Sequence, residues 1–109
     1  MKISSLISES SIPVNIKLEL TFFIKSIIDK IKNANSFDQF KDLFISKVID
    51  SVLEINYDKT KNSITFLIER NGLLISCKLI VKKTPISFTL DKLEFANLGD
   101  IELTHFGSY

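Results

Sequence analysis

The sequence has little of the residues that build disulfide frameworks, metal centres and phosphate-binding loops. Its 109 residues include one cysteine, one histidine, three glycines, two prolines and no tryptophan. A single cysteine excludes an intrachain disulfide, and one histidine with one cysteine cannot make a typical zinc site. Three glycines leave no glycine-rich loop for nucleotide phosphates. We therefore expect no metal and no cofactor, and the scarcity of glycine and proline argues against a disordered chain.

The chain also lacks an excess of charge of either sign. Fourteen basic and 13 acidic residues give a net charge of +1, and Arg70 is the sole arginine. Because arginine is preferred for bidentate contacts with phosphate and guanine, this composition disfavours nucleic acid as a partner. The first residues lack the apolar core of a signal peptide, and no stretch reaches the length of a membrane span. The sequence predicts a soluble cytoplasmic protein without a membrane partner.

What the sequence does have is a strong hairpin signal at Asn71-Gly72. This pair supplies the positive φ angles of a type I′ turn between two runs, residues 62–70 and 73–83. Counting outward from the turn gives one wholly apolar face, from the pairs Ile68–Ile75, Phe66–Cys77 and Ile64–Leu79. The other face is mixed, from the pairs Glu69–Leu74, Leu67–Ser76 and Thr65–Lys78. This pattern predicts a hairpin with one side on a hydrophobic core.

A helix is predicted between Pro13 and residue 33. Apolar residues recur at helical spacing from Ile16 to Ile31, and Pro13 with the serines before it resembles a helix start. Residues 14–24 also alternate between apolar and polar side chains, which is a strand pattern. The helical pattern explains the longer stretch and is preferred. A strand that hands over to a helix near Phe23 is the alternative.

The second helix begins at a capping box, in which Ser36 is the cap and Gln39 lies three residues on. Apolar residues then recur from Phe37 to Val52. Further apolar residues flank this stripe, namely Leu43, Ile45, Ile49 and Leu53. A helix with more than one apolar stripe is either enclosed in the core or presents a second face to a partner.

Strands make up the rest of the predicted fold. Residues 53–58 alternate as a strand, and another begins near Ile86. The alternation of this strand slips at Asp91-Lys92, where a β-bulge is preferred over a tight turn because the site has no glycine. Residues 97–100 are predicted as a turn, and residues 101–106 as a last strand.

The predicted fold class is α+β, with two N-terminal helices packed on one face of an antiparallel meander of about five strands. Residues 1–109 are expected to form a single domain, with residues 1–12 as a loose lead-in.

The outer face of the predicted hairpin is the candidate partner-binding site. It places apolar side chains beside charged ones, which is more typical of a protein contact than of a phosphate track. The residues are Leu67, Glu69, Leu74, Lys78, Ile80 and Lys82. Lys59, Lys61, Lys78, Lys82 and Lys83 form the one basic concentration in the sequence.

The functional prediction is a small non-enzymatic protein-binding module with no catalytic residues. Abundant Ile, Lys, Asn and Phe hint at an AT-rich bacterial or phage coding sequence. Small single-domain proteins of that origin are often immunity proteins, antitoxins or inhibitors. We therefore expect a toxin or defence protein as the partner, neutralised by occlusion. A homodimer is compatible with the same surfaces.

Two other functions are left open by the sequence. One is a binder of a lipid or other apolar small molecule, in a cavity lined by Phe22, Phe23, Phe40, Phe44, Phe66 and Phe88. The other is a small enzyme that uses His105 with Asp100 or Cys77. The hairpin register instead predicts Cys77 as a small buried hydrophobic residue.

Overall fold

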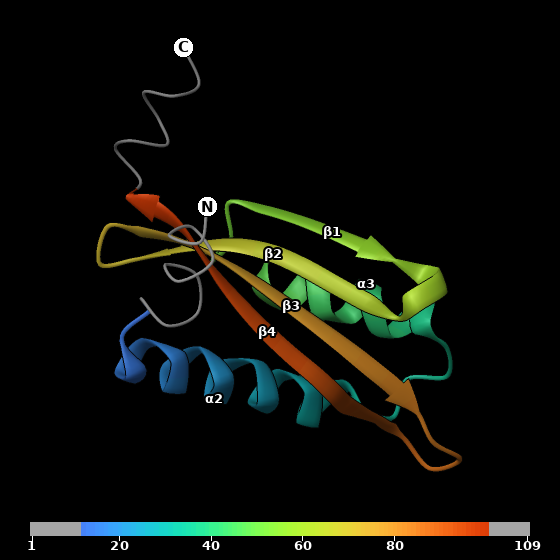
Figure 1. Ribbon diagram of the computed structural model, residues 1–109. Helices are drawn as coiled ribbons and strands as arrows, with labels where there is room; N and C mark the ends of the chain where they lie inside the picture. The colour runs from blue at the N-terminus through green and yellow to red at the C-terminus, as the bar shows by residue number, and fades with distance from the viewer. Residues whose placement is uncertain (1–11, 101–109) are drawn as a thin grey trace.

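Two helices cover one face of a four-stranded antiparallel sheet in the computed structural model, which describes residues 12–100 (Figure 1). The strands neighbour one another in chain order, β1-β2-β3-β4. The elements are α2 (Val14–Ile31), α3 (Phe37–Val48), β1 (Glu54–Asp58), the 3-10 helix η2 (Lys59–Lys61), β2 (Ser63–Arg70), β3 (Leu73–Lys83) and β4 (Phe88–Asp100). The predicted α+β meander with two helices on one face is confirmed, with four strands rather than about five.

Helix α2 explains the ambiguous pattern of residues 14–24. Its buried side chains are Ile16, Leu20, Ile24, Ile27, Ile28 and Ile31, which recur every three or four residues, with Ile27 and Ile28 adjacent, as one helical face requires. The remaining apolar residues of the alternation, Val14, Leu18 and Phe22, are exposed. Two apolar rows on different sides of one helix therefore produced the strand-like alternation, and the strand alternative is wrong.

The start of α2 differs from the prediction in two details. Pro13 is the N-cap residue, and no side chain caps the helix there. The serines proposed as the cap lie outside the described residues. Ile12 is buried in the core, so the predicted loose lead-in does not include it.

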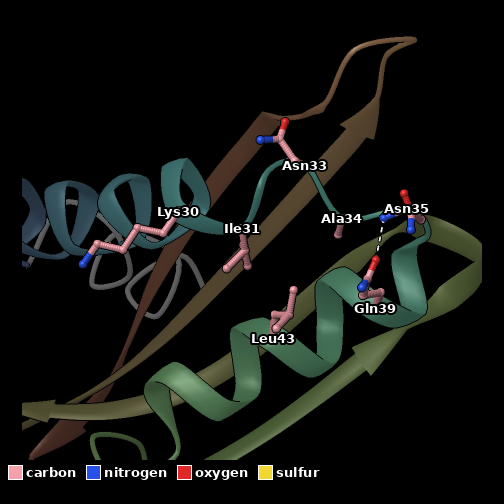
Figure 2. A pocket seen from close by; sticks show the side chains of 7 residues that line it. All are labelled: Lys30, Ile31, Asn33, Ala34, Asn35, Gln39 and Leu43. Carbon is pink, nitrogen blue, oxygen red and sulfur yellow. Dashed lines mark hydrogen bonds between the residues drawn. The ribbon is translucent and has the colours of Figure 1, made fainter.

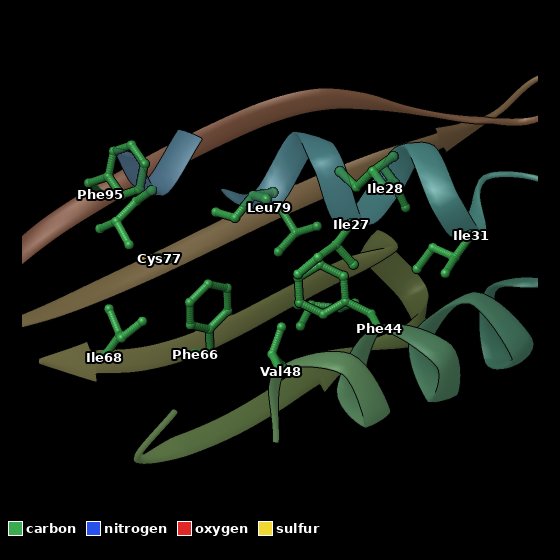
Figure 3. Close-up of a cluster of buried hydrophobic side chains, with 14 of the residues drawn as sticks. Ile27, Ile28, Ile31, Phe44, Val48, Phe66, Ile68, Cys77, Leu79 and Phe95 are labelled. Carbon is green, nitrogen blue, oxygen red and sulfur yellow. The ribbon is translucent and has the colours of Figure 1, made fainter. Parts of the chain in front are cut away.

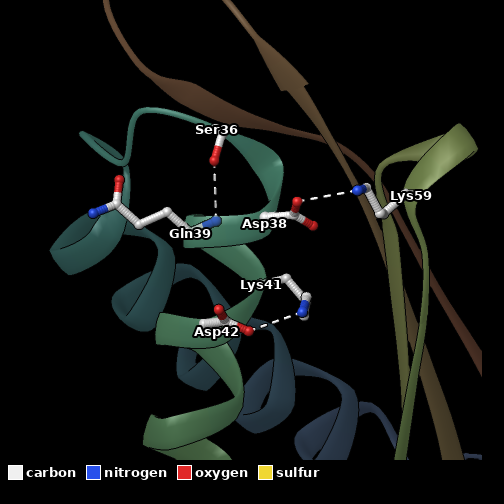
Figure 4. A network of polar contacts seen from close by, with 6 residues as sticks. All are labelled: Ser36, Asp38, Gln39, Lys41, Asp42 and Lys59. Carbon is white, nitrogen blue, oxygen red and sulfur yellow. Dashed lines mark hydrogen bonds and ion pairs between the residues drawn. The ribbon is translucent and has the colours of Figure 1, made fainter.

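Helix α3 begins with the predicted capping box. The Ser36 Oγ accepts a hydrogen bond from the Gln39 amide at 3.2 Å, and the Gln39 Oε1 accepts one from the Asn35 amide at 2.6 Å (Figures 2 and 4). The helix ends at Val48, one turn earlier than the predicted end at Val52. The chain turns after Val48. Leu53 then donates its amide to the Leu67 carbonyl, next to the start of β1.

The β2–β3 hairpin has the predicted turn and register. Asn71 and Gly72 have φ angles of 54° and 81°, and the Gly72 amide donates to the Glu69 carboxylate at 2.7 Å. The pairs Ile68–Ile75, Phe66–Cys77 and Ile64–Leu79 form as predicted, and their six side chains are fully buried. The pairs Glu69–Leu74, Leu67–Ser76 and Thr65–Lys78 face the other way.

Strand β4 contains two irregularities. The register passes from Ile80–Lys92 to Val81–Leu90, which leaves Asp91 unpaired and confirms the predicted bulge over the tight turn. A second shift lies near Gly99, which has a φ of 106° and donates its amide to the Asn97 side chain at 2.8 Å. Residues 97–100 therefore form a bulged part of β4, and the predicted turn there is wrong. The predicted strand at 101–106 lies outside the described residues.

The hydrophobic core fills the space between the helices and the inner face of the sheet (Figure 3). Phe44 of α3 lies over Phe66 of β2, with 6.0 Å between ring centroids. Phe40 meets Phe88 of β4 at 4.9 Å. Ile27, Ile28 and Ile31 of α2 extend the same cluster (Figure 3). Both helices thus pack against the apolar face of the hairpin.

Replacing Gly72 tests the hairpin turn. Gly72→Val should lower the free energy of unfolding by about 1–2 kcal/mol, because a β-branched residue is strained at positive φ. No atom lies within 4 Å of an added Cβ there, so backbone strain is the main cost. Gly72→Asn is the control and should lose clearly less, since asparagine tolerates this conformation. Denaturant titration measures both, and equal losses would contradict the type I′ turn.

Candidate functional site

The outer face of the sheet, opposite the two helices, holds all six residues proposed from the sequence. The alternation of β2 and β3 places them there, from Glu69 and Leu74 beside the hairpin turn to Lys82 near the end of β3. Leu74 and Lys82 are eight residues apart on β3, which is about 27 Å along a strand. The site is therefore an elongated strip along the hairpin, and its two ends lie far apart.

Exposure differs among these six side chains. Lys82 is exposed, while Leu67, Glu69, Lys78 and Ile80 are half-buried. Leu74 is only 6% exposed, although it is on the outer face and outside the core cluster. The register thus assigns Leu74 to the correct face, but its side chain is almost inaccessible to a partner. The accessible apolar part of the strip comes from Leu67 and Ile80.

Lys78 and Lys82 supply the positive charge of this strip. The four ion pairs found among residues 12–100 are Lys32–Asp29, Lys41–Asp42, Lys59–Asp38 and Arg70–Glu19, so neither lysine is in one. The register places Lys78 opposite Glu94 and Ile80 opposite Lys92. The strip is therefore a mixed surface with a basic half towards the end of β3.

Two of the five lysines in the predicted basic concentration have local roles instead. Lys59 donates to the Asp38 carboxylate of α3 at 3.0 Å (Figure 4). Lys83 extends its ammonium group over the Phe88 ring, 5.5 Å from the centroid. These contacts link η2 to α3 and the end of β3 to the start of β4, and the Asp38 carboxylate offsets the charge of Lys59.

Helix α2 carries an exposed apolar row that was not proposed as a site from the sequence. Val14, Leu18 and Phe22 are 69%, 65% and 76% exposed. The signal is present in the alternation of residues 14–24, because on a helix this pattern places Val14, Leu18 and Phe22 together on one side. Phe22 faces away from the core and does not line an interior cavity.

The phenylalanines proposed to line a ligand cavity mostly pack against one another. The rings of Phe40, Phe44, Phe66 and Phe88 form neighbouring contacts with centroids 4.9–6.4 Å apart. A depression of about 210 Å³ does lie between the C-terminal end of α2 and the start of α3 (Figure 2). Its lining residues are Lys30, Ile31, Asn33, Ala34, Asn35, Gln39 and Leu43. None of the six phenylalanines is among them.

The residues proposed for an enzymatic function lie only in part within the described chain. Cys77 is fully buried, and burial raises the pKa of its thiol to about 12, so the thiol is neutral near pH 7. His105 and the side chain of Asp100 lie outside the part of the chain that the structure describes. Within residues 12–100, no group of three or more His, Cys, Asp and Glu side chains is arranged to hold a metal ion. No described helix is long and apolar enough to span a membrane.

Known proteins give no independent guide to the site. No protein-family model matches the chain, and neither a curated protein nor a solved structure matches it. The surfaces and side chains described above are therefore the basis for a functional proposal.

The reactivity of Cys77 tests its burial. The native protein should react with a thiol reagent such as Ellman's reagent only after unfolding, because the buried thiol is neutral and inaccessible. Rapid labelling of the native protein would contradict this environment.

The same pKa shift predicts a loss of stability at high pH. An unfolded cysteine titrates near 9, whereas the folded pKa is about 12, so between these values the unfolded state binds fewer protons. The free energy of unfolding should therefore fall as the pH rises above 9. Cys77→Ala is the control, because the difference between its pH profile and that of the wild type isolates the thiol from tyrosine and lysine titrations.

Proposed function

We propose that this chain is a small protein-binding module that acts without catalysis, by covering a surface of another protein. The observation that supports it is the outer face of the sheet, which neither described helix covers and where Leu67 and Ile80 lie beside Lys78 and Lys82. Both helices pack on the opposite face, so nothing in residues 12–100 lies over this strip as a layer (Figure 1). Apolar side chains with a charged rim are typical of protein contacts.

The partner that we propose is a toxin or a defence protein, which makes this chain an immunity protein or an inhibitor. In this mechanism the strip docks on the partner's functional surface and excludes its substrate or target. The basic half of the strip, at Lys78 and Lys82, would meet acidic side chains and guide the approach. A reducing cytoplasm is the proposed place of action, which agrees with the unpaired thiol of Cys77.

Charge reversal on the strip tests this proposal. Lys78→Glu combined with Lys82→Glu should weaken binding of the partner at least tenfold, because both new carboxylates would face an acidic surface. The partner is captured from a lysate of the source cells with the wild-type chain, purified, and titrated against both proteins by isothermal calorimetry. Leu74→Asp is unsuitable, since it would bury a carboxylate at a site only 6% exposed.

The matched control reverses two exposed lysines of the helices, Lys30→Glu with Lys47→Glu. It changes the net charge by the same amount and should leave the affinity within about twofold. Circular dichroism establishes that both variants are folded. A partner that binds the strip variant as tightly as the wild type would contradict docking on the sheet. Self-association of the wild type, abolished by the strip variant, would identify the partner as a second copy.

A further inference from the structure

A second surface lies on α2, on the side of the helix that points away from the sheet. Val14, Leu18 and Phe22 are four residues apart, so they form one continuous row about 12 Å long on the helix surface. All three are more than 60% exposed, whereas the neighbouring residues Ile16 and Leu20 fill the core. We call this set, Val14, Leu18 and Phe22, the α2 row. Helix α2 lies on the opposite side of the sheet from the outer sheet strip, so the two surfaces are separate (Figure 1).

The charges beside the α2 row are predominantly positive. Lys17, Thr21 and Lys25 form a parallel row on one flank, three residues on from each apolar side chain. Neither Lys17 nor Lys25 is in an ion pair with any residue of 12–100. The acidic residues of the same helix are engaged: Glu19 accepts from Arg70 at 3.1 Å, and Asp29 pairs with Lys32 at 3.1 Å.

We propose that the α2 row binds an amphipathic helix of another protein that has acidic side chains along one flank. The apolar side chains of the partner helix would pack on Leu18 and Phe22, in the way that the ridges of one helix pack into the grooves of another. Its acidic residues would face Lys17 and Lys25, which are eight residues or about 12 Å apart. Carboxylates about seven or eight residues apart on the partner match that spacing. This surface is independent of the outer sheet strip and of the function proposed for it.

The same geometry disfavours a second copy of this chain as the occupant. In an antiparallel pair of α2 helices, equivalent flanks meet, so Lys17 and Lys25 would face the same lysine row of the other copy. In a parallel pair the lysine row would meet the opposite flank, where Glu19 is already bound to Arg70.

An anionic membrane surface fits the α2 row less well than a protein helix does. The apolar row ends at Phe22, and the exposed side of α2 continues with Lys25 and Asp29. Asp29 would then face anionic head groups. The remaining apolar residues of α2 are buried in the core and are not available for insertion.

Two synthetic helical peptides test the proposal. Both carry leucines at every third or fourth position, and one has two glutamates seven residues apart on a flank where the other has two lysines. In low-salt buffer the glutamate peptide should bind at least about tenfold more tightly, because it alone complements the lysine row. Amide NMR titration should show shifts concentrated in residues 14–25. Lys17→Glu with Lys25→Glu should reverse the preference between the peptides.

The control is the sheet variant, Lys78→Glu with Lys82→Glu. It makes the same change in net charge on the other surface, and should keep the preference for the glutamate peptide. Failure of the sheet strip as a docking site would therefore leave this result unaffected. Equal affinity for both peptides, binding of neither at millimolar concentration, or shifts centred outside α2 would overturn the proposal. So would binding to phosphatidylglycerol vesicles that the Lys17/Lys25 variant loses, or a dimer that Leu18→Glu dissolves.

Discussion

Burial of one face of the β2–β3 hairpin is the constraint on which the rest of the structure depends. Side chains alternate between faces along a strand, so a slip of one residue would move six fully buried side chains to the solvent. The turn at Asn71-Gly72 sets the register locally, independently of the helices. Phe66 and Leu79 then belong to the apolar surface against which α3 and α2 pack. The core phenylalanines and isoleucines follow from that one alignment.

Placing both helices on this floor has a consequence for the surface of the protein. A four-stranded sheet with one covered face leaves the other face open, and this chain places Leu67 and Ile80 there. Helix α2 likewise uses one side for the core and keeps Val14, Leu18 and Phe22 on the other. Part of the apolar content of the sequence therefore lies outside the core between the two layers. Both proposed binding surfaces include such side chains.

The parts of the fold that depend on local chemistry could be predicted from the sequence. Asn71-Gly72 determines its turn through φ alone, Ser36 and Gln39 determine the start of α3, and the phase slip beside Asp91 predicts its bulge. Residues 97–100 were misassigned because glycine and asparagine suit both a turn and a bulge. A choice between the two depends on whether β3 continues alongside, which is tertiary information.

The candidate sites could be predicted only in part, for a related reason. Periodicity identifies the face on which a side chain lies, and it placed Leu67, Leu74 and Lys78 on the correct side of the hairpin. It does not measure how much of the side chain water reaches, so the burial of Leu74 could not be foreseen. In α2 the alternation of residues 14–24 concealed the exposed row, because a strand would place Val14 and Ile16 on the same face, whereas a helix places them on different faces. Helix geometry had to be known before that row could be recognised.

The two bulges of β4 also determine how this sheet meets copies of itself. β4 is an edge strand of the described sheet and has 13 residues, whereas the other edge, β1, has five. A long and regular edge offers unpaired backbone groups to other chains and promotes aggregation. The irregularities at Asp91 and near Gly99 divide the pairing of β4 with β3 into a stretch from Phe88 to Leu90 and one from Lys92 to Asn97, and Lys92 and Glu94 lie within the second. These interruptions and charges limit the ability of this edge to template a continuous intermolecular sheet along its full length.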